Sequence, residues 1–132
     1  MAYHYSTQVS KPFNEVVSTI TDSLKRQGFG IITSIDMKAT LKEKLNVDFR
    51  DYKILGACNP QFAHKALSVE PQIGVMLPCN VVVQQQENGV VAVSAVNPME
   101  TMDKTLSPEL KQVAAEVSNR LRTAVDELRG AA

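Results

Sequence analysis

The sequence predicts an α+β fold in which helices lie mainly on one face of a largely antiparallel sheet. Three observations carry this prediction: the elements follow the order β-α-β-α-β-α-β-β-α, a hairpin comes late in the chain, and a long helix closes it. With 132 residues and 14.5 kDa, the chain has the length of a single domain, residues 1–132. A folded chain of this mass buries about two-thirds of its unfolded surface, which is enough for a core without metal or disulfides.

The first two elements are a strand and an amphipathic helix. Residues 3–9 alternate, so that every second side chain shares one face, as in a strand. Ser10 and Pro12 mark a helix start. The helix that follows carries one apolar stripe, and Gly28 ends it because glycine tolerates a left-handed cap. The stripe consists of Phe13, Val16, Val17, Ile20 and Leu24.

The middle of the chain alternates strands and short helices. Residues 29–37 are rich in β-branched side chains and predict a strand, 38–46 predict a short, charged, exposed helix, and 52–58 predict a further strand. Asn59 can cap the next helix and Pro60 fits its first position. Its buried side is predicted to contain Phe62, Ala63, Ala66 and Leu67. Residues 73–77 form another apolar run, which a strand would explain.

Residues 79–96 give the strongest β signal of the chain. Asn88-Gly89 predicts a two-residue hairpin turn, because both residues tolerate positive φ. That turn pairs Glu87 with Val90 and leaves both faces apolar near the Cys79 end. An antiparallel sheet with one wet face should alternate more cleanly. We therefore expect a second copy of the chain to cover part of one face, as a homodimer; the alternative is a central hairpin covered within one monomer.

A long amphipathic helix closes the chain. Ser107 and Pro108 open it and Gly130 ends it. One apolar stripe runs along about five turns and consists of Leu110, Val113, Ala114, Val117, Leu121, Ala124, Val125 and Leu128. This helix is therefore predicted to cover the sheet.

The charge of the chain excludes some partners. Fourteen basic and fourteen acidic residues cancel, and the pI is near 6.7, which argues against a nucleic-acid partner because such binders need a concentrated basic face. The halves differ, since residues 1–66 hold nine basic and six acidic residues and residues 67–132 hold five and eight. No Lys or Arg occurs in the 38 residues 66–103. This weakly charged stretch is where we expect a buried sheet, a partner surface and any site.

Targeting signals are not evident in the sequence. The first residues contain no apolar run of the secretory type, and no stretch reaches the length of a membrane span. Two cysteines are too few for a disulfide scaffold. We therefore expect a cytoplasmic protein with two free thiols.

Two Cys-Asn pairs, Cys58-Asn59 and Cys79-Asn80, are the chemically interesting features. A thiol beside a helix N-terminus is biased toward thiolate, so Cys58 is a candidate nucleophile, redox thiol or soft-metal ligand. Cys79 and His64 are its candidate partners. The methionines that could add soft ligands for Cu(I) are Met76, Met99 and Met102. The competing interpretation is that both cysteines are small buried hydrophobic residues.

Several signals expected of such sites are missing. A close CxxC pair, a set of four zinc ligands, an evident base with an orienting partner and a glycine-rich phosphate loop are all absent from the sequence. The pattern therefore assigns no reaction and no cofactor, and it leaves open whether the protein is an enzyme.

Residues 54–83, ILGACNPQFAHKALSVEPQIGVMLPCNVVV, resemble the family called domain of unknown function 302, and Asn97-Pro98 and the opening strand and helix fit it as well. The resemblance implies a TATA-binding-protein-like fold with a curved antiparallel sheet, and a tendency to dimerise, with no established activity. It implies a shared site at Cys58, Asn59, Pro60, Pro78, Cys79 and Asn80. It also implies that Gly56 and Gly74 shape the backbone.

The sequence thus predicts a homodimeric binding or interaction module that takes a small ligand on the curved sheet or in the dimer groove. Its candidate site adds His64 to the shared positions. The alternatives are a thiol-dependent redox protein or enzyme that uses Cys58 with Cys79 and His64, and a soft-metal binder at the same residues.

Overall fold

The computed structural model of the protein describes residues 2–102 and 106–130. Its strands are β1 (His4–Val9), β2 (Gly30–Asp36), β3 (Tyr52–Cys58), β4 (Cys79–Gln85) and β5 (Val91–Val96). Its helices are α1 (Phe13–Arg26), α2 (Met37–Leu45), α3 (Pro60–Val69), α4 (Pro98–Thr101) and α5 (Pro108–Gly130). Two short 3₁₀ segments, η1 (Pro71–Met76) and η2 (Glu87–Gly89), lie on either side of β4. The predicted α+β class and the predicted order of strands and long helices are confirmed.

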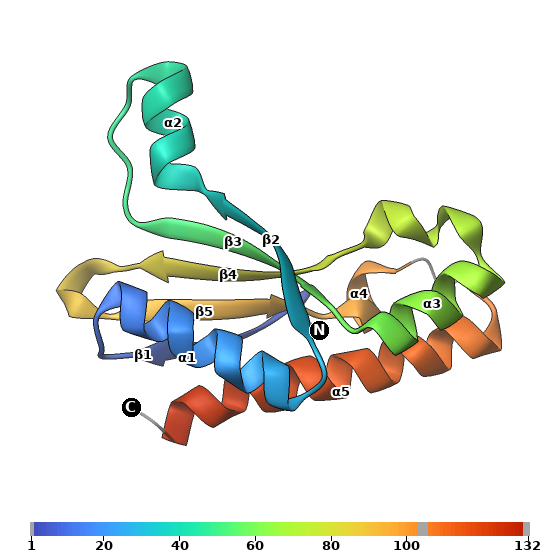
Figure 1. Ribbon diagram of the computed structural model, residues 1–132. Coiled ribbons are helices and arrows are strands. Elements are labelled where there is room, and N and C mark those ends of the chain that lie inside the picture. The colour runs from blue at the N-terminus through green and yellow to red at the C-terminus, as the bar shows by residue number, and fades with distance from the viewer. Residues whose placement is uncertain (1, 103–105, 131–132) are drawn as a thin grey trace.

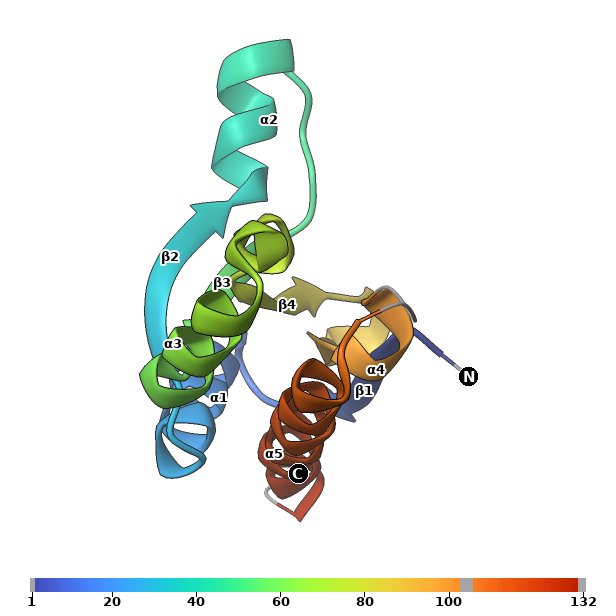
Figure 2. The ribbon, with the colours of Figure 1, turned by 90° about the vertical axis from the view of Figure 1, so that its right-hand side faces the viewer.

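The strands form one sheet in the order β1-β5-β4-β3-β2, and each neighbouring pair is antiparallel. Helices α1, α3 and α5 lie on one side of this sheet (Figures 1 and 2). The β2 end of the sheet turns upward and continues into α2, so that an arm projects from the body. The predicted arrangement, with helices mainly on one face, is therefore confirmed.

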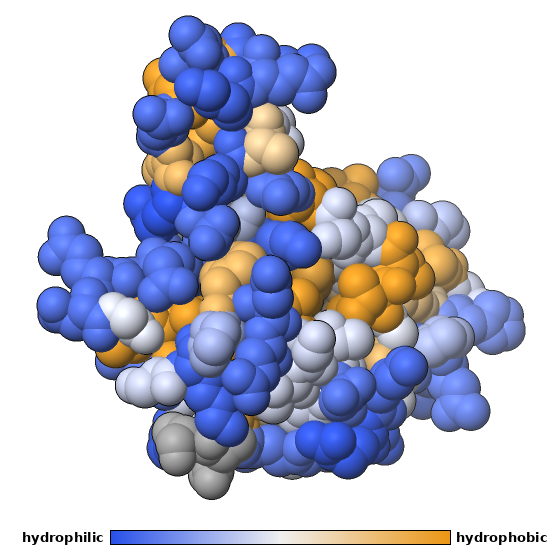
Figure 3. All heavy atoms as spheres, turned by 60° about the vertical axis from the view of Figure 1, so that its left-hand side comes forward, coloured by the Kyte–Doolittle hydropathy of each residue, from blue (hydrophilic) through white to orange (hydrophobic). Residues whose placement is uncertain are grey.

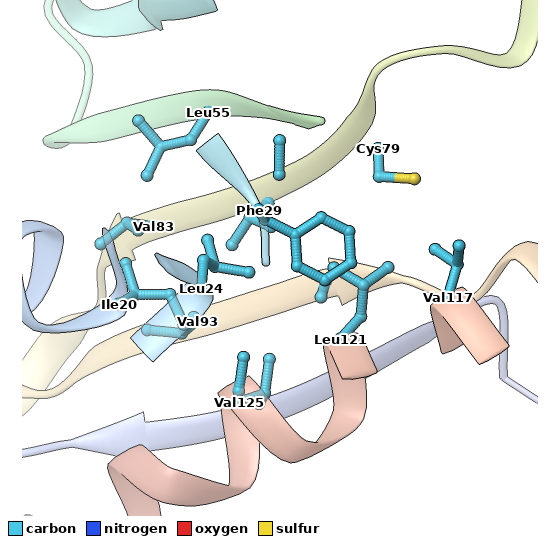
Figure 4. Close-up of a cluster of buried hydrophobic side chains, with 14 of the residues drawn as sticks. Ile20, Leu24, Phe29, Leu55, Cys79, Val83, Val93, Val117, Leu121 and Val125 are labelled. Carbon is cyan, nitrogen blue, oxygen red and sulfur yellow. The ribbon is translucent and has the colours of Figure 1, made fainter. Parts of the chain in front are cut away.

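The valine side chains of β4 and β5 make the centre of the core. Val81 pairs with Ala95 and Val83 with Val93, and all four side chains are buried toward the helices. The apolar stripes predicted for α1 and α5 pack onto them (Figure 4). Figure 4 shows Leu24 of α1 and Leu121 of α5 on either side of Phe29. Burying these stripes against the sheet is the main stabilisation of the fold.

The predicted hairpin register is wrong by one residue. The loop has three residues, Glu87–Gly89, and the Gln86 amide donates to the Val90 carbonyl at 2.7 Å. Asn88 and Gly89 both have positive φ, as expected, at 66° and 72°. A shift of one residue moves every side chain to the other face. On the face of the hairpin that packs against the helices, all side chains at the centre are consequently apolar. The opposite face carries both apolar and polar side chains, so the expected apolar patch on both faces does not occur.

Three local predictions also need correction. Residues 73–77 are not a strand, because the segment from Pro71 folds as the 3₁₀ helix η1. The short helix α4 went unpredicted; the Asn97 side chain caps it by accepting a hydrogen bond from the Met99 amide at 3.1 Å. Leu67 is 41% exposed, although the spacing placed it on the buried side of α3. These elements are too short for periodicity to fix their orientation.

Gly56 and Gly74, the two glycines expected to shape the backbone, differ in whether a side chain would fit at their positions. A Cβ atom at Gly56 would overlap Thr33 Oγ1 and would lie 2.7 Å from Pro78 Cγ, so β2, β3 and the start of β4 meet there too closely for any side chain. At Gly74 a Cβ atom would lie 3.7 Å from its nearest neighbour, Leu67 Cδ2, which is ordinary contact. Only Gly56 is therefore required by packing, and the expectation for Gly74 is wrong.

We predict that Gly56→Ala lowers the free energy of unfolding by about 2 kcal/mol, because threonine and proline side chains are too stiff to move away. Gly74→Ala is the matched control and should change it by less than about 0.5 kcal/mol or raise it slightly. Urea unfolding followed by circular dichroism measures both. Equal effects of the two substitutions would contradict this account of Gly56.

Candidate functional site

An apolar cavity of about 320 Å³ lies where α3, η1 and α5 meet the ends of β3 and β4. Its walls are the residues Phe29, Ile32, Ala57, Cys58, Asn59, Phe62, Ala63, Ala66, Leu67, Ile73, Gly74, Leu77, Pro78, Cys79, Met102, Leu110, Val113, Ala114 and Val117. None of these has a charged side chain of the Asp, Glu, Lys or Arg type. A volume of this size with apolar walls is typical of a small-molecule site.

Strand register and a helix cap bring the two cysteine segments together. Ala57 pairs with Cys79, so Cys58 and Cys79 sit at neighbouring strand ends. The Asn59 side chain then caps α3 by accepting a hydrogen bond from the Phe62 amide at 3.4 Å, as its type predicted. This cap starts the helix immediately after β3 and turns the Phe62 and Ala63 side toward the cavity.

Four of the seven predicted site residues line this cavity: Cys58, Asn59, Pro78 and Cys79. Pro60 is exposed at the first position of α3 and His64 is exposed further along it, and neither is part of the wall. Asn80 is exposed and lines a hollow on the opposite face of the sheet. Together with Pro78 and Cys79 it also lines a smaller hollow of about 240 Å³. Because side chains alternate along β4, Asn80 and Cys79 point to opposite faces of the sheet.

Most of the cavity wall was not predicted as a site. Leu110, Val113 and Val117 belong to the apolar stripe that predicts a helix covering the sheet, and they also line the cavity. Ile73 and Leu77 belong to the segment that was expected to be a strand. The signal was present as an apolar stripe, but a stripe that packs on a core and a stripe that lines a cavity have the same spacing.

The environment of Cys79 does not favour thiolate chemistry. Burial raises the pKa of the Cys79 thiol to about 11, and a negative charge on the nearby Cys58 would raise it further. Figure 4 shows Cys79 at the end of the core, near Phe29 and Val117. Both cysteines are free. Cys79 therefore remains a neutral thiol at physiological pH and acts as part of the wall, which weakens the redox interpretation.

The expected soft-metal ligands are brought together only in part. Within residues 2–102 and 106–130, no three side chains of the His, Cys, Asp or Glu type gather closely enough to hold a metal ion. Met76, Met102 and Cys79 line one hollow of about 240 Å³, whereas Met99, Cys58 and His64 are not part of its wall. The same described part of the chain contains no helix that is both long and apolar enough to cross a membrane.

Comparison with known proteins places the chain in a family. The family model described as Domain of unknown function DUF302 matches residues 5–128. The chain belongs to the DUF302 family. The crystal structure of an uncharacterized conserved DUF302 protein from Bacillus stearothermophilus is similar, with a TM-score of 0.88 and 34% identity; the match covers 98% of this chain and all of the other. An uncharacterized protein of Aquifex aeolicus is 21% identical over 122 residues, which cover 90% of this chain and 78% of that protein.

The face of the DUF302 sheet that lies opposite the helices is a wide, uncharged hollow of about 770 Å³. Its walls are Tyr3, His4, Ser6, Thr7, Gln8, Tyr52, Asn80, Val82, Gln84, Gln86, Ala92, Ser94, Ala95 and Val96. Some of the polar groups bind one another: Ser6 Oγ is 2.6 Å from His4 Nδ1 and 2.7 Å from Ser94 Oγ, and Gln8 Nε2 donates to Gln86 Oε1 at 2.9 Å. Gln84 Oε1 accepts a hydrogen bond from Arg50 Nε at 3.1 Å, at the edge of the hollow. A wide surface of mixed polarity without charged wall residues suits contact with another protein surface.

We predict that Cys79 in the Cys58→Ser variant reacts with iodoacetamide at pH 8 about 100-fold more slowly than a free cysteine, because a pKa near 11 leaves so little thiolate. The rate should rise with pH until about 11. The raised pKa also means that Cys79 stabilises the folded state fully below the pKa of an unfolded cysteine, and that this contribution is lost as the pH rises toward 11. Rapid alkylation of the folded variant near pH 7 would contradict the assignment.

Proposed function

We propose that this protein is a homodimeric binding module that holds a small, largely apolar molecule in the cavity between α3, η1 and α5. The observation that carries the proposal is the cavity itself, about 320 Å³ with almost wholly apolar walls. The cavity is an open cleft, since its wall residues Ile32 and Leu67 are 61% and 41% exposed. Exposed apolar side chains gathered in one cleft are typical of a binding site. An apolar ligand restores the contacts that the walls otherwise lack.

The arm supports the homodimeric part of the proposal. We define the arm as residues 34–51, the outer end of β2 with α2 and the segment that follows. No residue of α2 is buried, and Figures 1 and 2 show the helix standing clear of the body. Ile35, Leu45 and Val47 of the arm are 45%, 66% and 43% exposed. Figure 3 shows orange apolar side chains among the blue ones of the arm. Exposed apolar side chains on a projecting element are typical of an interface.

A second copy of the chain is the partner whose polarity fits. The arm is neutral as a whole, because its four basic residues are balanced by four acidic ones. The described walls of the hollow carry no Asp, Glu, Lys or Arg side chain. The neutral arm with its exposed apolar side chains therefore complements the open face of another copy in polarity.

We predict that Ala63→Phe weakens binding of the neutral fluorescent probe 1-naphthol, which is small enough for a cavity of about 320 Å³, about tenfold or more, because the ring occupies the space that the probe fills. His64→Phe adds the same ring to the exposed side of the same helix and should change the affinity less than twofold. Fluorescence titration measures both. Binding that is unaffected by Ala63→Phe, or absent in the unmodified protein, would rule out the cavity as the site.

We predict that light scattering gives a mass of twice 14.5 kDa at micromolar concentration. Leu45→Glu should shift the protein toward monomer, because it places a charge in the apolar part of the contact. Gln112→Glu adds the same charge to the exposed side of α5 and should leave the dimer intact. Since Leu45 and Gln112 are both exposed, neither change should affect folding. A monomer mass for the unmodified chain would overturn the homodimer.

A further inference from the structure

The chemistry of the cavity mouth narrows the class of ligand, and this inference rests on the proposed cavity function. We propose that the ligand is an aliphatic monocarboxylate, with its tail in the cavity and its carboxylate on Arg120 and Asn59. The cavity walls contain no Asp, Glu, Lys or Arg among the described residues, so a charged group on the ligand needs a partner beside the wall. We define the mouth as the edge of the wall at Asn59, Phe62 and Val117, next to Arg120.

Arg120 is positioned at that mouth by three elements. It lies one helical turn after Val117, a wall residue, so the two side chains share a side of α5. Its guanidinium carbon is 5.3 Å from the centre of the Phe62 ring, which is also part of the wall. Its Nη1 donates to the Gln27 carbonyl at 3.1 Å, at the end of α1. Stacking and this hydrogen bond hold the guanidinium beside the opening.

Asn59 approaches the same point from the other side. A Cβ atom at Gly28 would lie 2.8 Å from Asn59 Nδ2 and 3.6 Å from Arg120 Nη1. Both polar groups therefore converge on one glycine, whose φ of 89° places it in the left-handed region. Asn59 uses its Oδ1 for the cap of α3, which leaves its Nδ2 as a donor. A guanidinium and an amide donor side by side are suited to a carboxylate.

Arg120 retains free donors for such a ligand. A guanidinium has five N–H donors. Within residues 2–102 and 106–130, Arg120 Nε donates a hydrogen bond to Glu116 Oε1 at 3.1 Å, and Arg120 Nη1 donates one to the Gln27 carbonyl. Nη2 donates no hydrogen bond in that part of the chain. Glu116 offsets part of the positive charge, but it is 48% exposed and the pair is correspondingly weak. The Nη2 edge therefore remains available to a carboxylate.

The volume of the cavity sets the length of the tail. A heavy atom in condensed matter occupies about 30 Å³, the share that one water molecule takes in the liquid. A cavity of about 320 Å³ then holds roughly ten heavy atoms. This corresponds to straight-chain acids of about eight to ten carbons. Each methylene that enters should increase the affinity about fourfold until the cavity is full.

Calorimetric titration of the intact protein with hexanoate, octanoate and decanoate tests whether the ligand is an aliphatic monocarboxylate. The neutral compound for comparison is 1-octanol. We expect the affinity to rise about fourfold per methylene, and octanoate to bind at least tenfold more tightly than octanol because only the acid pairs with the guanidinium. Arg120→Met keeps a long side chain without the charge and should weaken octanoate about tenfold while changing octanol less than twofold. Arg122→Met makes the same change at an exposed position of α5 and should alter neither.

The outcomes separate this inference from the proposed function. If octanol and octanoate bind equally, or if Arg120→Met weakens both equally, the carboxylate assignment is overturned and the cavity still binds an apolar molecule. If none of the ligands binds to the unmodified protein, both are overturned. Arg120→Lys, which retains a positive charge, should lie between the unmodified protein and Arg120→Met. The comparison of acid with alcohol requires no variant, so a variant that folds poorly leaves the test intact.

Discussion

The structure depends on the burial of one face of the central hairpin. Val81, Val83, Val93 and Ala95 all point toward the helices, and the long stripes of α1 and α5 complete the core against them. Because side chains alternate along a strand, this burial places the even-numbered side chains of β4 on the opposite face. The uncharged hollow there is therefore a consequence of how the core is built. It is also the surface that a second copy of the chain is proposed to cover.

The cavity arises at the edge of this core, where the chain leaves the sheet. Asn59 starts α3 immediately after β3, and the 3₁₀ helix η1 returns the chain to β4, so both elements join the core only at its edge, through Ala66 and Ile73. The space between them and α5 is lined with apolar side chains from all three. Cys79 illustrates the result: the burial that makes it a good wall residue raises the pKa of its thiol to about 11 and suppresses its nucleophilicity. Cys79 thus contributes to the cavity wall as a neutral, apolar side chain.

The location of single charges bears on both proposals. The chain is neutral overall, the arm is neutral as well, and strands β4 and β5 at the floor of the hollow carry no Lys or Arg. Arg120 lies beside a cavity whose wall, among the described residues, contains no Asp, Glu, Lys or Arg. In a neutral molecule, the location of single charges is therefore more informative than their sum. Membership of the DUF302 family supports the fold of the chain and assigns no role to any of these residues.

Local signals in the sequence were sufficient for the elements that are long or capped: the stripes of α1 and α5, the Asn59 cap, the charged exposed α2 and the limits of β3. They also pointed to four cavity residues through the two Cys-Asn pairs. They failed for the hairpin register, because Asn-Gly fits a two-residue and a three-residue loop equally well. Only burial of Val93 and Ala95 on the same side as Val81 and Val83 selects the three-residue loop. The same local signals do not reveal that His64 and Asn80 lie outside the cavity wall, since adjacency to a wall residue does not fix the direction of a side chain. Periodicity and capping act within a few residues and determined the elements. The meeting of Arg120, Asn59 and Gly28 joins three distant segments, so only tertiary packing could decide it.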